Sequence, residues 1–282
     1  MRIDEALRGA TKLLAAHSID GARRDASVLL VSVLGGDREI LFRAPEQILT
    51  EPEVQQFQKL IDRRATREPV SHILGQREFW SRDFFVTSDV LDPRPDSETL
   101  IDAVLKHTKE TRAPDAILDL GTGSGCLLLT LLAEIKNAKG VGVDLSDKAL
   151  EIAVKNAKSL SLEDRSSFLK SLWFENVSGT FDVIVSNPPY IETDDIAGLQ
   201  TEVRDFEPRL ALDGGEDGLE CYRQITAEIS VFLKPEGFVI FEVGIGQDVA
   251  VGNLMRGAGF ENIKVHYDLA SVARCVSGQS KK

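Results

Sequence analysis

The stretch AILDLGTGSG, residues 116–125, decides the fold class of this chain. It begins with a short, mostly apolar run that suits a buried strand, and the apolar residues 126–135 that follow predict a helix. Glycines at 121, 123 and 125 allow a tight turn between the two elements and a close approach of the backbone to a ligand. We therefore predict a strand, a ligand-binding turn and a helix in direct succession.

After this turn, the chain alternates short apolar runs with helical patterns. Helices are expected at 147–159, at about 218–232 and from 247 onward, and further strand-like runs are found at 141–144, 167–169, 181–186, 238–243, 263–267 and 274–277. Such alternation is typical of a parallel sheet built from βαβ units. Because no helical pattern separates the last two runs, we expect them to pair antiparallel. The predicted fold class is α/β, with a mostly parallel, doubly wound sheet of seven strands.

The chain before the turn has a different character. Apolar residues recur there at helical spacing, and Thr50 with Glu53 forms the capping box of a helix expected to run to about Thr66. The next segment alternates aromatic residues and valines with polar residues, which predicts a β-hairpin. We expect a helical domain at 1–75, a hairpin linker at 76–92 and an α/β domain at 93–282.

The sequence PRPDSE, residues 93–98, connects the hairpin to the next expected helix. Its two prolines stiffen the approach to that helix. The side chain of Asp96 or Ser97 can then cap a helix that continues through Leu105.

The composition is typical of a globular protein, with 43% hydrophobic and 28% charged residues. The longest apolar run, 126–133, is far shorter than the roughly 20 residues that cross a bilayer. The N-terminus carries acidic residues at once and lacks an apolar segment followed by a cleavage site, so we expect no secretory signal and a cytoplasmic protein.

Cysteines, histidines and net charge narrow the chemistry further. The three cysteines lack C-x-x-C spacing and the four histidines lack H-x-x-x-H spacing, so we expect reduced cysteines and no bound metal. The net charge of −12 disfavours nucleic acid as the main partner. One local basic cluster, Arg63, Arg64 and Arg67, is interpreted as a solvated helix end.

An acidic residue follows the glycine turn at the spacing that is typical of a ribose-binding carboxylate. Asp144 ends the next expected strand about twenty residues later, where a carboxylate can accept hydrogen bonds from ribose hydroxyls. The turn is only part of a dinucleotide fingerprint, because Cys126 follows Gly125 and the last glycine of G-x-G-x-x-G is missing. Together, the turn and the carboxylate predict binding of an adenosine-type cofactor.

The sequence NPPY, residues 187–190, ends the expected strand 181–186. The carboxyl end of this strand should lie near the topological switch point, where open α/β sheets bind ligands. The Asn187 side-chain carbonyl and the Pro188 main-chain carbonyl can accept two hydrogen bonds from one planar NH₂ group. Pro188 and Pro189 fix this geometry, and Tyr190 can stack on the same group. The simpler alternative is a proline-rich turn that only ends the strand.

These motifs resemble a known family. DLGTGSG, VGVD and NPPY together look like the class I S-adenosylmethionine-dependent methyltransferases. The segments 77–98 and 206–219, NPPY and the helical N-terminal region resemble, more narrowly, the bacterial peptide chain release factor N5-glutamine methyltransferases. The resemblance extends from about Asp20 to Val276 and implies a Rossmann-like methyltransferase domain. It also implies S-adenosyl-L-methionine as the cofactor and, as the target, the side-chain nitrogen N5 of the glutamine in the Gly-Gly-Gln loop of class 1 release factors.

The resemblance also assigns roles to individual residues. It implies that Asn187, Pro188, Pro189 and Tyr190 bind the substrate, with Asn187, Pro188 and Tyr190 acting in catalysis. Two positions depart from the family pattern, because Leu172 replaces an acidic residue and Ser97 replaces threonine. The implied cofactor contacts are Gly121, Thr122, Gly123, Ser124, Gly125, Asp144, Trp173 and Asn187.

Two other functions stay open at this point. An adenine-N6 methyltransferase acting on DNA or RNA would use the same NPPY chemistry, although it would need a basic recognition surface. A non-catalytic module could hold a partner protein with a degenerate cofactor fold, although the intact motifs disfavour this. The resemblance implies class 1 release factors as protein substrates, no stable nucleic-acid binding and no membrane association. Because one glutamine amide offers few contacts, we expect residues 1–75 to contact a release-factor surface away from the target loop.

Overall fold

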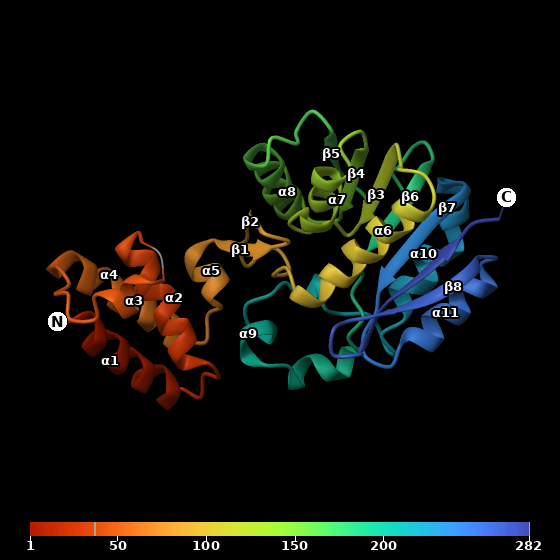
Figure 1. Ribbon diagram of the computed structural model, residues 1–282. Coiled ribbons are helices and arrows are strands. Elements are labelled where there is room, and N and C mark those ends of the chain that lie inside the picture. Colours follow the sequence, from red (N-terminus) through yellow and green to blue (C-terminus); the bar gives the residue numbers. More distant parts are fainter. Residues whose placement is uncertain (37, 282) are drawn as a thin grey trace. The chain divides into compact units, whose positions relative to one another are not determined.

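The computed structural model describes residues 1–36 and 38–281, and these form two compact units (Figure 1). The first unit, called the helical unit here, comprises Met1–Gln76 together with Gln200–Phe206. The second, called the α/β unit, comprises Arg77–Leu199 and Glu207–Lys282. Among the described residues, no helix has the length and apolar character needed to cross a membrane.

A seven-stranded sheet forms the centre of the α/β unit. Its strands lie in the order β5-β4-β3-β6-β7-β9-β8. Neighbouring strands from β5 to β7 are parallel, whereas β9 is antiparallel to both β7 and β8. This confirms the predicted α/β fold class, including the antiparallel pair at its end. The strands are β3 (Ala116–Leu120), β4 (Lys139–Asp144), β5 (Ser166–Lys170), β6 (Phe181–Ser186), β7 (Leu233–Glu242), β8 (Glu261–Tyr267) and β9 (Ala273–Gln279).

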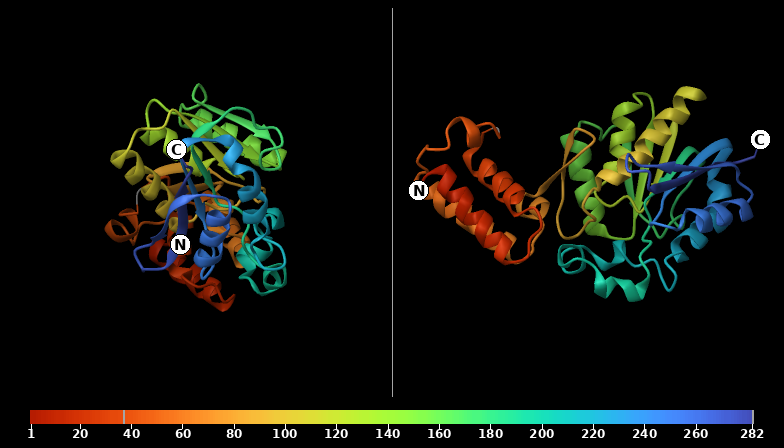
Figure 2. Two further views of the ribbon diagram at one scale, coloured as in Figure 1. Left: turned by 90° about the vertical axis from the view of Figure 1, so that its right-hand side faces the viewer. Right: turned by 60° about the horizontal axis from the view of Figure 1, so that its bottom comes forward.

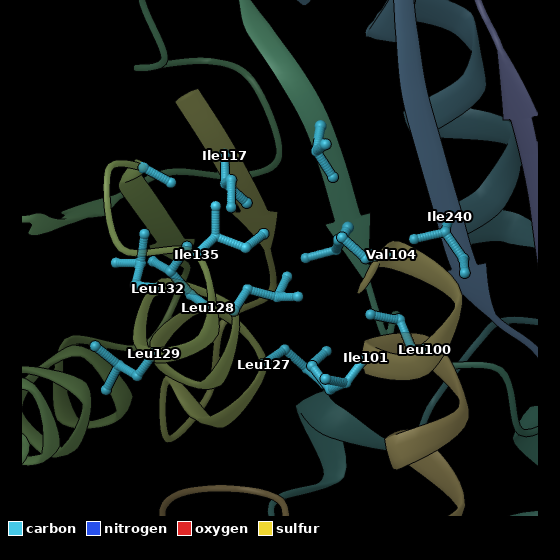
Figure 3. Packing of buried hydrophobic residues seen from close by; sticks show 14 of the residues in the cluster. Leu100, Ile101, Val104, Ile117, Leu127, Leu128, Leu129, Leu132, Ile135 and Ile240 are labelled. Atoms are coloured by element: carbon cyan, nitrogen blue, oxygen red, sulfur yellow. The ribbon is translucent and has the colours of Figure 1, made fainter. Parts of the chain in front are cut away.

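Helices cover both faces of this sheet (Figures 1 and 2). Successive strand residues point to opposite faces, so Ile117 packs in one apolar cluster and Leu118 in the other. Figure 3 shows the first cluster, in which leucines of α7 and apolar residues of α6 surround Ile117 and Ile240. The second cluster contains α10 and α11. The helices are α6 (Glu98–Glu110), α7 (Cys126–Glu134), α8 (Asp147–Ser159), α10 (Glu220–Phe232) and α11 (Asp248–Gly257).

The strand order creates a topological switch point between β3 and β6. The chain runs from β3 to β4 and β5 on one side and then returns to place β6 on the other side of β3. Leu120 of β3 lies opposite Ser186 of β6. The next residues along the two strands are Gly121 and Asn187, so the glycine turn and NPPY leave the sheet side by side.

Short elements complete the α/β unit. The predicted hairpin is present as β1 (Gln76–Phe79) and β2 (Arg82–Phe85). Asn156 of α8 holds its second strand, because the Asn156 Oδ1 accepts a 2.7 Å hydrogen bond from Phe85 N and the Asn156 Nδ2 donates to Phe85 O at 3.0 Å. Three short 3₁₀ helices follow in the chain: η1 (Pro95–Ser97), η2 (Thr193–Gly198) and η3 (Arg209–Ala211).

The cap predicted for α6 is wrong. Ser97 precedes this helix, but it already has helical backbone angles and its side chain makes no capping hydrogen bond. The 3₁₀ turn Pro95–Ser97 leads directly into the helix, so no extended capping residue stands between them. The Ser97 side chain is buried in the α/β unit instead.

The helical unit has its own apolar core, formed chiefly by α1, α2 and α4. The predicted capping box is confirmed at the start of α4, where Glu53 Oε2 accepts a 2.6 Å hydrogen bond from Thr50 N. The helices are α1 (Ile3–Ala16), α2 (Ala22–Leu34), α3 (Ile40–Arg43), α4 (Glu51–Ala65), α5 (Val70–Leu74) and α9 (Thr201–Arg204).

A buried ion-pair network joins α9 to the rest of the helical unit. Arg64 binds Asp25 at 2.9 Å and Glu202 at 3.0 Å, and Arg67 binds Glu202 at 2.6 Å. Only 5% of Arg64 is exposed, so the interpretation of this cluster as a solvated helix end is wrong for Arg64. Its acidic partners come from positions far away in the sequence, which a local charge pattern does not reveal.

Candidate functional site

A cavity of about 280 Å³ lies at the carboxyl ends of β3, β4 and β6. Most of the residues that the sequence assigned to a site meet there. Gly125, Pro188 and Tyr190 were also assigned but do not belong to the cavity lining. The predicted residues that line the cavity are Gly121, Thr122, Gly123, Ser124, Asp144, Trp173, Asn187 and Pro189.

The glycine turn has the backbone conformation that its sequence predicts. Gly121, Gly123 and Gly125 have φ angles of +69°, +55° and +79°, in the left-handed region that favours glycine. Gly125 serves helix packing, because a Cβ atom there would lie 3.1 Å from Leu129 Cδ1 and 3.2 Å from Ala153 Cβ. Gly121 and Gly123 therefore shape the cavity, while Gly125 lets α7 approach α8.

Asp119 stabilises the glycine turn through a hydrogen bond with Thr122. It is fully buried at the end of β3, and its Oδ2 accepts a 2.7 Å hydrogen bond from the Thr122 hydroxyl. Burial raises the pKa of Asp119 to about 7. Its Oδ1 has no hydrogen-bond partner within residues 1–36 and 38–281. The buried carboxyl thus anchors one side of the turn without facing the cavity.

Asp144 stands at the end of β4 and borders the cavity. Its Oδ2 accepts a 2.9 Å hydrogen bond from Gly123 N, and its Oδ1 accepts one of 2.9 Å from Ser146 N. A carboxylate offers about four lone-pair positions, so both oxygens keep capacity for ligand hydroxyls. These backbone bonds hold the carboxylate between the glycine turn and the start of α8, as a ribose-binding group requires.

Trp173 provides an aromatic surface beside the turn. Its φ angle of +44° is rare for a bulky residue and marks a backbone held in place by its surroundings. The indole Nε1 donates a 2.7 Å hydrogen bond to Gln224 Oε1. Leu172, which is 40% exposed, also lines the cavity, so an apolar side chain is present where the family pattern has an acidic one. Trp173 and Leu172 together suit the flat face of an adenine ring.

The segment NPPY is held by close backbone packing and by a hydrogen bond from Gln247. A Cβ atom on Gly214 would lie 2.7 Å from Tyr190 Cα, so only glycine permits this approach of the segment 206–219. Gln247 Nε2 donates a 3.0 Å hydrogen bond to Tyr190 O. Burial raises the pKa of Tyr190 to about 12, which keeps its phenol neutral. The ring of Tyr190 packs against the apolar cluster of α10 and α11, outside the cavity lining.

An arginine and a glutamate that sequence reasoning missed lie near the cavity. Arg94 lines it, and one guanidinium nitrogen of Arg94 contacts both carboxylate oxygens of Glu207 at 2.6 and 2.7 Å. Burial raises the pKa of Glu207 to about 7, although Arg94 opposes this shift. Both residues belong to the segments that carry the resemblance, so the motif itself was the available signal.

Glu242 was also missed. It is the last residue of β7 and is 3% exposed. Burial raises its pKa to about 7, while the nearby side chains of Ser97 and Asn187 oppose this shift. An acidic residue directly after the apolar run VIF could have been noticed by the same reasoning that identified Asp144.

Two family descriptions match the chain. The family described as "PrmC N-terminal domain" matches residues 5–75, and the one described as "Methyltransferase small domain" matches residues 92–204. The release factor glutamine methyltransferase of Rhodospirillum rubrum is 44% identical over 269 residues, which cover 95% of this chain and 82% of that protein. The release factor glutamine methyltransferase of Cereibacter sphaeroides is 42% identical over 280 residues, which cover 99% of each.

Solved structures agree on the fold. A methyltransferase from Pyrococcus furiosus superposes with a TM-score of 0.53 at 18% identity, covering 72% of this chain and 91% of that chain. The hMettl16 catalytic domain, solved with an RNA hairpin, superposes with a TM-score of 0.57 at 15% identity, covering 83% of each chain. At these identities the likeness shows the methyltransferase fold alone.

Proposed function

The chain belongs to the release factor glutamine methyltransferase family, and from this premise we propose that it methylates the glutamine in the Gly-Gly-Gln loop of class 1 peptide chain release factors. The acceptor is the side-chain amide nitrogen, N5, and the methyl donor is S-adenosyl-L-methionine. One observation carries the proposal: Asn187 lines the same cavity as the glycine turn and Asp144. An amide-binding group is thereby adjacent to the cofactor-binding residues.

The cofactor fits the residues that are present. Asp144 would accept hydrogen bonds from the ribose hydroxyls, and the turn from Gly121 to Ser124 would face the cofactor with its backbone. Trp173 and Leu172 would contact the adenine ring. When bound, S-adenosyl-L-methionine supplies an electrophilic methyl group on a positively charged sulfur.

Asn187 and Pro188 would orient the glutamine amide. The Asn187 Oδ1 and the Pro188 carbonyl can each accept one hydrogen bond from the amide NH₂ group. An amide nitrogen is a weak nucleophile, so its placement supplies most of the rate enhancement. The two carbonyl oxygens also stabilise the positive charge that develops on the nitrogen as it is methylated. Stacking of Tyr190 on the amide stays a prediction.

The alternative, methylation of adenine in DNA or RNA, has less support. The relatives that align along nearly the whole chain are named for glutamine in release factors. The net charge of −12 also disfavours a nucleic-acid surface, which would have to attract phosphate groups.

Incubation of the purified protein with radiolabelled S-adenosyl-L-methionine tests the proposal. One reaction contains a class 1 release factor, a second contains the same factor with its loop glutamine replaced by alanine, and a third contains adenine-containing DNA. We expect label only in the first reaction, on the peptide that carries the glutamine. Equal labelling of the two release factors, or labelling of DNA alone, would contradict the proposed function.

A further inference from the structure

A buried carboxyl group lies directly beside the amide-binding asparagine. Strands β6 and β7 are parallel, with Ser186 opposite Phe241. The next residues along the two strands, Asn187 and Glu242, are therefore neighbours at the carboxyl end of the sheet. Glu242 has no contact with the cavity, whereas Asn187 lines it. The carboxyl thus lies behind the side chain that would receive the substrate.

We propose that Glu242 is a positioning residue that sets the orientation of the Asn187 side-chain amide. This inference rests on the proposed function, because it concerns how Asn187 receives the glutamine. An asparagine side chain has an accepting end, Oδ1, and a donating end, the NH₂ group. Only the orientation with Oδ1 toward the cavity can accept a hydrogen bond from the substrate NH₂ group.

An ionised carboxylate selects this orientation because it can only accept hydrogen bonds. The strand register makes Asn187 and Glu242 neighbours, and the Asn187 side chain lowers the pKa of the Glu242 carboxyl. A hydrogen bond between an ionised Glu242 and Asn187 requires the Asn187 NH₂ group as the donor. The Oδ1 atom then points away from Glu242. The negative charge also polarises the Asn187 amide and strengthens Oδ1 as an acceptor, as charge-assisted hydrogen bonds do.

Ser97 is the second side chain that affects the charge of Glu242. Ser97 is 3% exposed, and its side chain lowers the pKa of the Glu242 carboxyl. Glu242 Oε2 has no hydrogen-bond partner in the part of the chain that the structure describes. The carboxyl is therefore supported by few donors, and its protonation state is sensitive to the loss of any one of them.

The charge of Glu242 changes in the neutral pH range. Protonation turns Glu242 into a possible donor to Asn187 Oδ1, which removes the preference for the productive orientation. Since the pKa of Glu242 is about 7, the productive orientation is favoured above this pH and lost below it. The charged and titratable groups that interact with Glu242 are Asp96, Arg274, Tyr190, Tyr222, Cys275 and Cys126.

Four of these neighbours titrate above the neutral pH range. Burial raises the pKa of Tyr190 and Cys126 to about 12, and it raises those of Tyr222 and Cys275 as well. Arg274 is held charged by its ion pairs with Asp96 and Asp268, both at 2.8 Å. The carboxyl groups of Asp119 and Glu207 also have pKa values of about 7, so a titration of the methylation rate in this range is assigned to Glu242 by variants of Glu242 and Ser97.

The experiment measures kcat/KM for an intact release factor between about pH 5.5 and pH 9. The wild-type value should rise through pH 7. Glu242→Gln should remove this rise and lower kcat/KM above pH 7 by tenfold or more, because a neutral amide can present either end to Asn187. The affinity for S-adenosyl-L-methionine should be unchanged. Glu228→Gln, a control at an exposed position on α10, should keep the wild-type pH profile.

Ser97→Ala provides a second variant that keeps the carboxyl. Loss of its hydroxyl removes a group that lowers the pKa of Glu242, so the midpoint of the pH profile should move upward. A purely structural role would change the melting temperature without moving this midpoint.

The results separate this inference from the proposed function. If the wild-type protein does not methylate the release factor, the proposed function fails. If it does, but Glu242→Gln and the wild type have the same pH profile, the positioning role alone is wrong. A Ser97→Ala midpoint equal to that of the wild type would also overturn it.

Discussion

Under the proposed function, the side-chain amide of Asn187 presents its carbonyl oxygen to the substrate, and the backbone that follows Asn187 is closely packed. Pro188 is buried, Pro189 lines the cavity, and the segment at Gly214 packs against the backbone of Tyr190. The rings of the two prolines fix their φ angles, so the backbone directly after Asn187 has little conformational freedom. The proposed contribution of Asn187 to catalysis is therefore the orientation of the substrate amide.

Replacement of Asn187 by alanine should abolish most methyl transfer and leave the fold intact. Loss of one orienting contact costs on the order of 10²-fold or more in rate. The measurement is kcat for release-factor methylation, with thermal unfolding recorded for the same preparation. Asn253→Ala, an exposed position on α11, is the matched control and should retain the wild-type rate. Near-normal turnover of Asn187→Ala would refute the role of this side chain.

Replacement of Asp144 by alanine should weaken cofactor binding. Hydrogen bonds to a charged acceptor contribute roughly 1.5–3 kcal/mol each, so affinity should fall by at least tenfold. The melting temperature should fall too, because Asp144 also accepts the backbone hydrogens of Gly123 and Ser146. Calorimetric titration with S-adenosyl-L-methionine gives the affinity. An unchanged dissociation constant would show that Asp144 holds only the turn.

At the scale of elements, the short helix α9 is unusual because its contacts are with a distant part of the chain. It follows η2 in the α/β unit by sequence, yet it is part of the helical unit. Glu202 receives both Arg64 and Arg67, and Arg64 is buried. A buried guanidinium requires carboxylate partners, so α9 completes the charge balance of the helical unit.

Replacement of Glu202 by alanine should therefore destabilise the helical unit. Arg64 keeps Asp25 as one partner, so the expected loss is about 1–3 kcal/mol rather than the cost of an isolated buried charge. Urea unfolding followed by circular dichroism measures it. Glu228→Ala, an exposed change on α10, is the control and should have little effect. Equal stability of the two variants would show that the network contributes nothing.

At the scale of the whole molecule, an enzyme that reads one glutamine needs recognition beyond the amide pocket. A single amide offers little contact area for discrimination between proteins. Among the exposed large apolar residues described in the helical unit, Phe42 is 75% exposed and Ile48 is 73% exposed. We propose that these side chains contact the release factor away from its Gly-Gly-Gln loop.

The double variant Phe42→Ala, Ile48→Ala should raise KM for intact release factor about tenfold, as expected for the loss of apolar anchor residues. The kcat value and the activity on a short glutamine-containing peptide should not change. Val231→Ala, at an exposed apolar position on α10, serves as the control. Equal proportional losses on protein and peptide would mean that these side chains support the fold instead of recognising the partner.

The sequence alone was sufficient for the order and type of the main elements. The apolar runs and glycine turn are local patterns, so β6 and α8 were predicted with the bounds that the structure shows. The motifs in residues 77–98 and 206–219, together with NPPY, indicate the family from the sequence alone. Secondary-structure elements and sequence motifs depend on residues that are close together along the chain, so they can be identified from the sequence.

Only the tertiary structure decided which distant residues meet. Glu242 lies beside Asn187 because β7 pairs with β6, and Ser97 is buried and lowers the pKa of that carboxyl instead of capping α6. Likewise, Arg64 is buried because Asp25 and Glu202 approach it from other elements. Burial, and with it the pKa of a carboxyl group, depends on what surrounds a side chain in space. A local sequence pattern does not identify neighbours from distant parts of the chain. The pKa of Glu242 and the ion pairs of Arg64 could therefore be determined only from the tertiary structure.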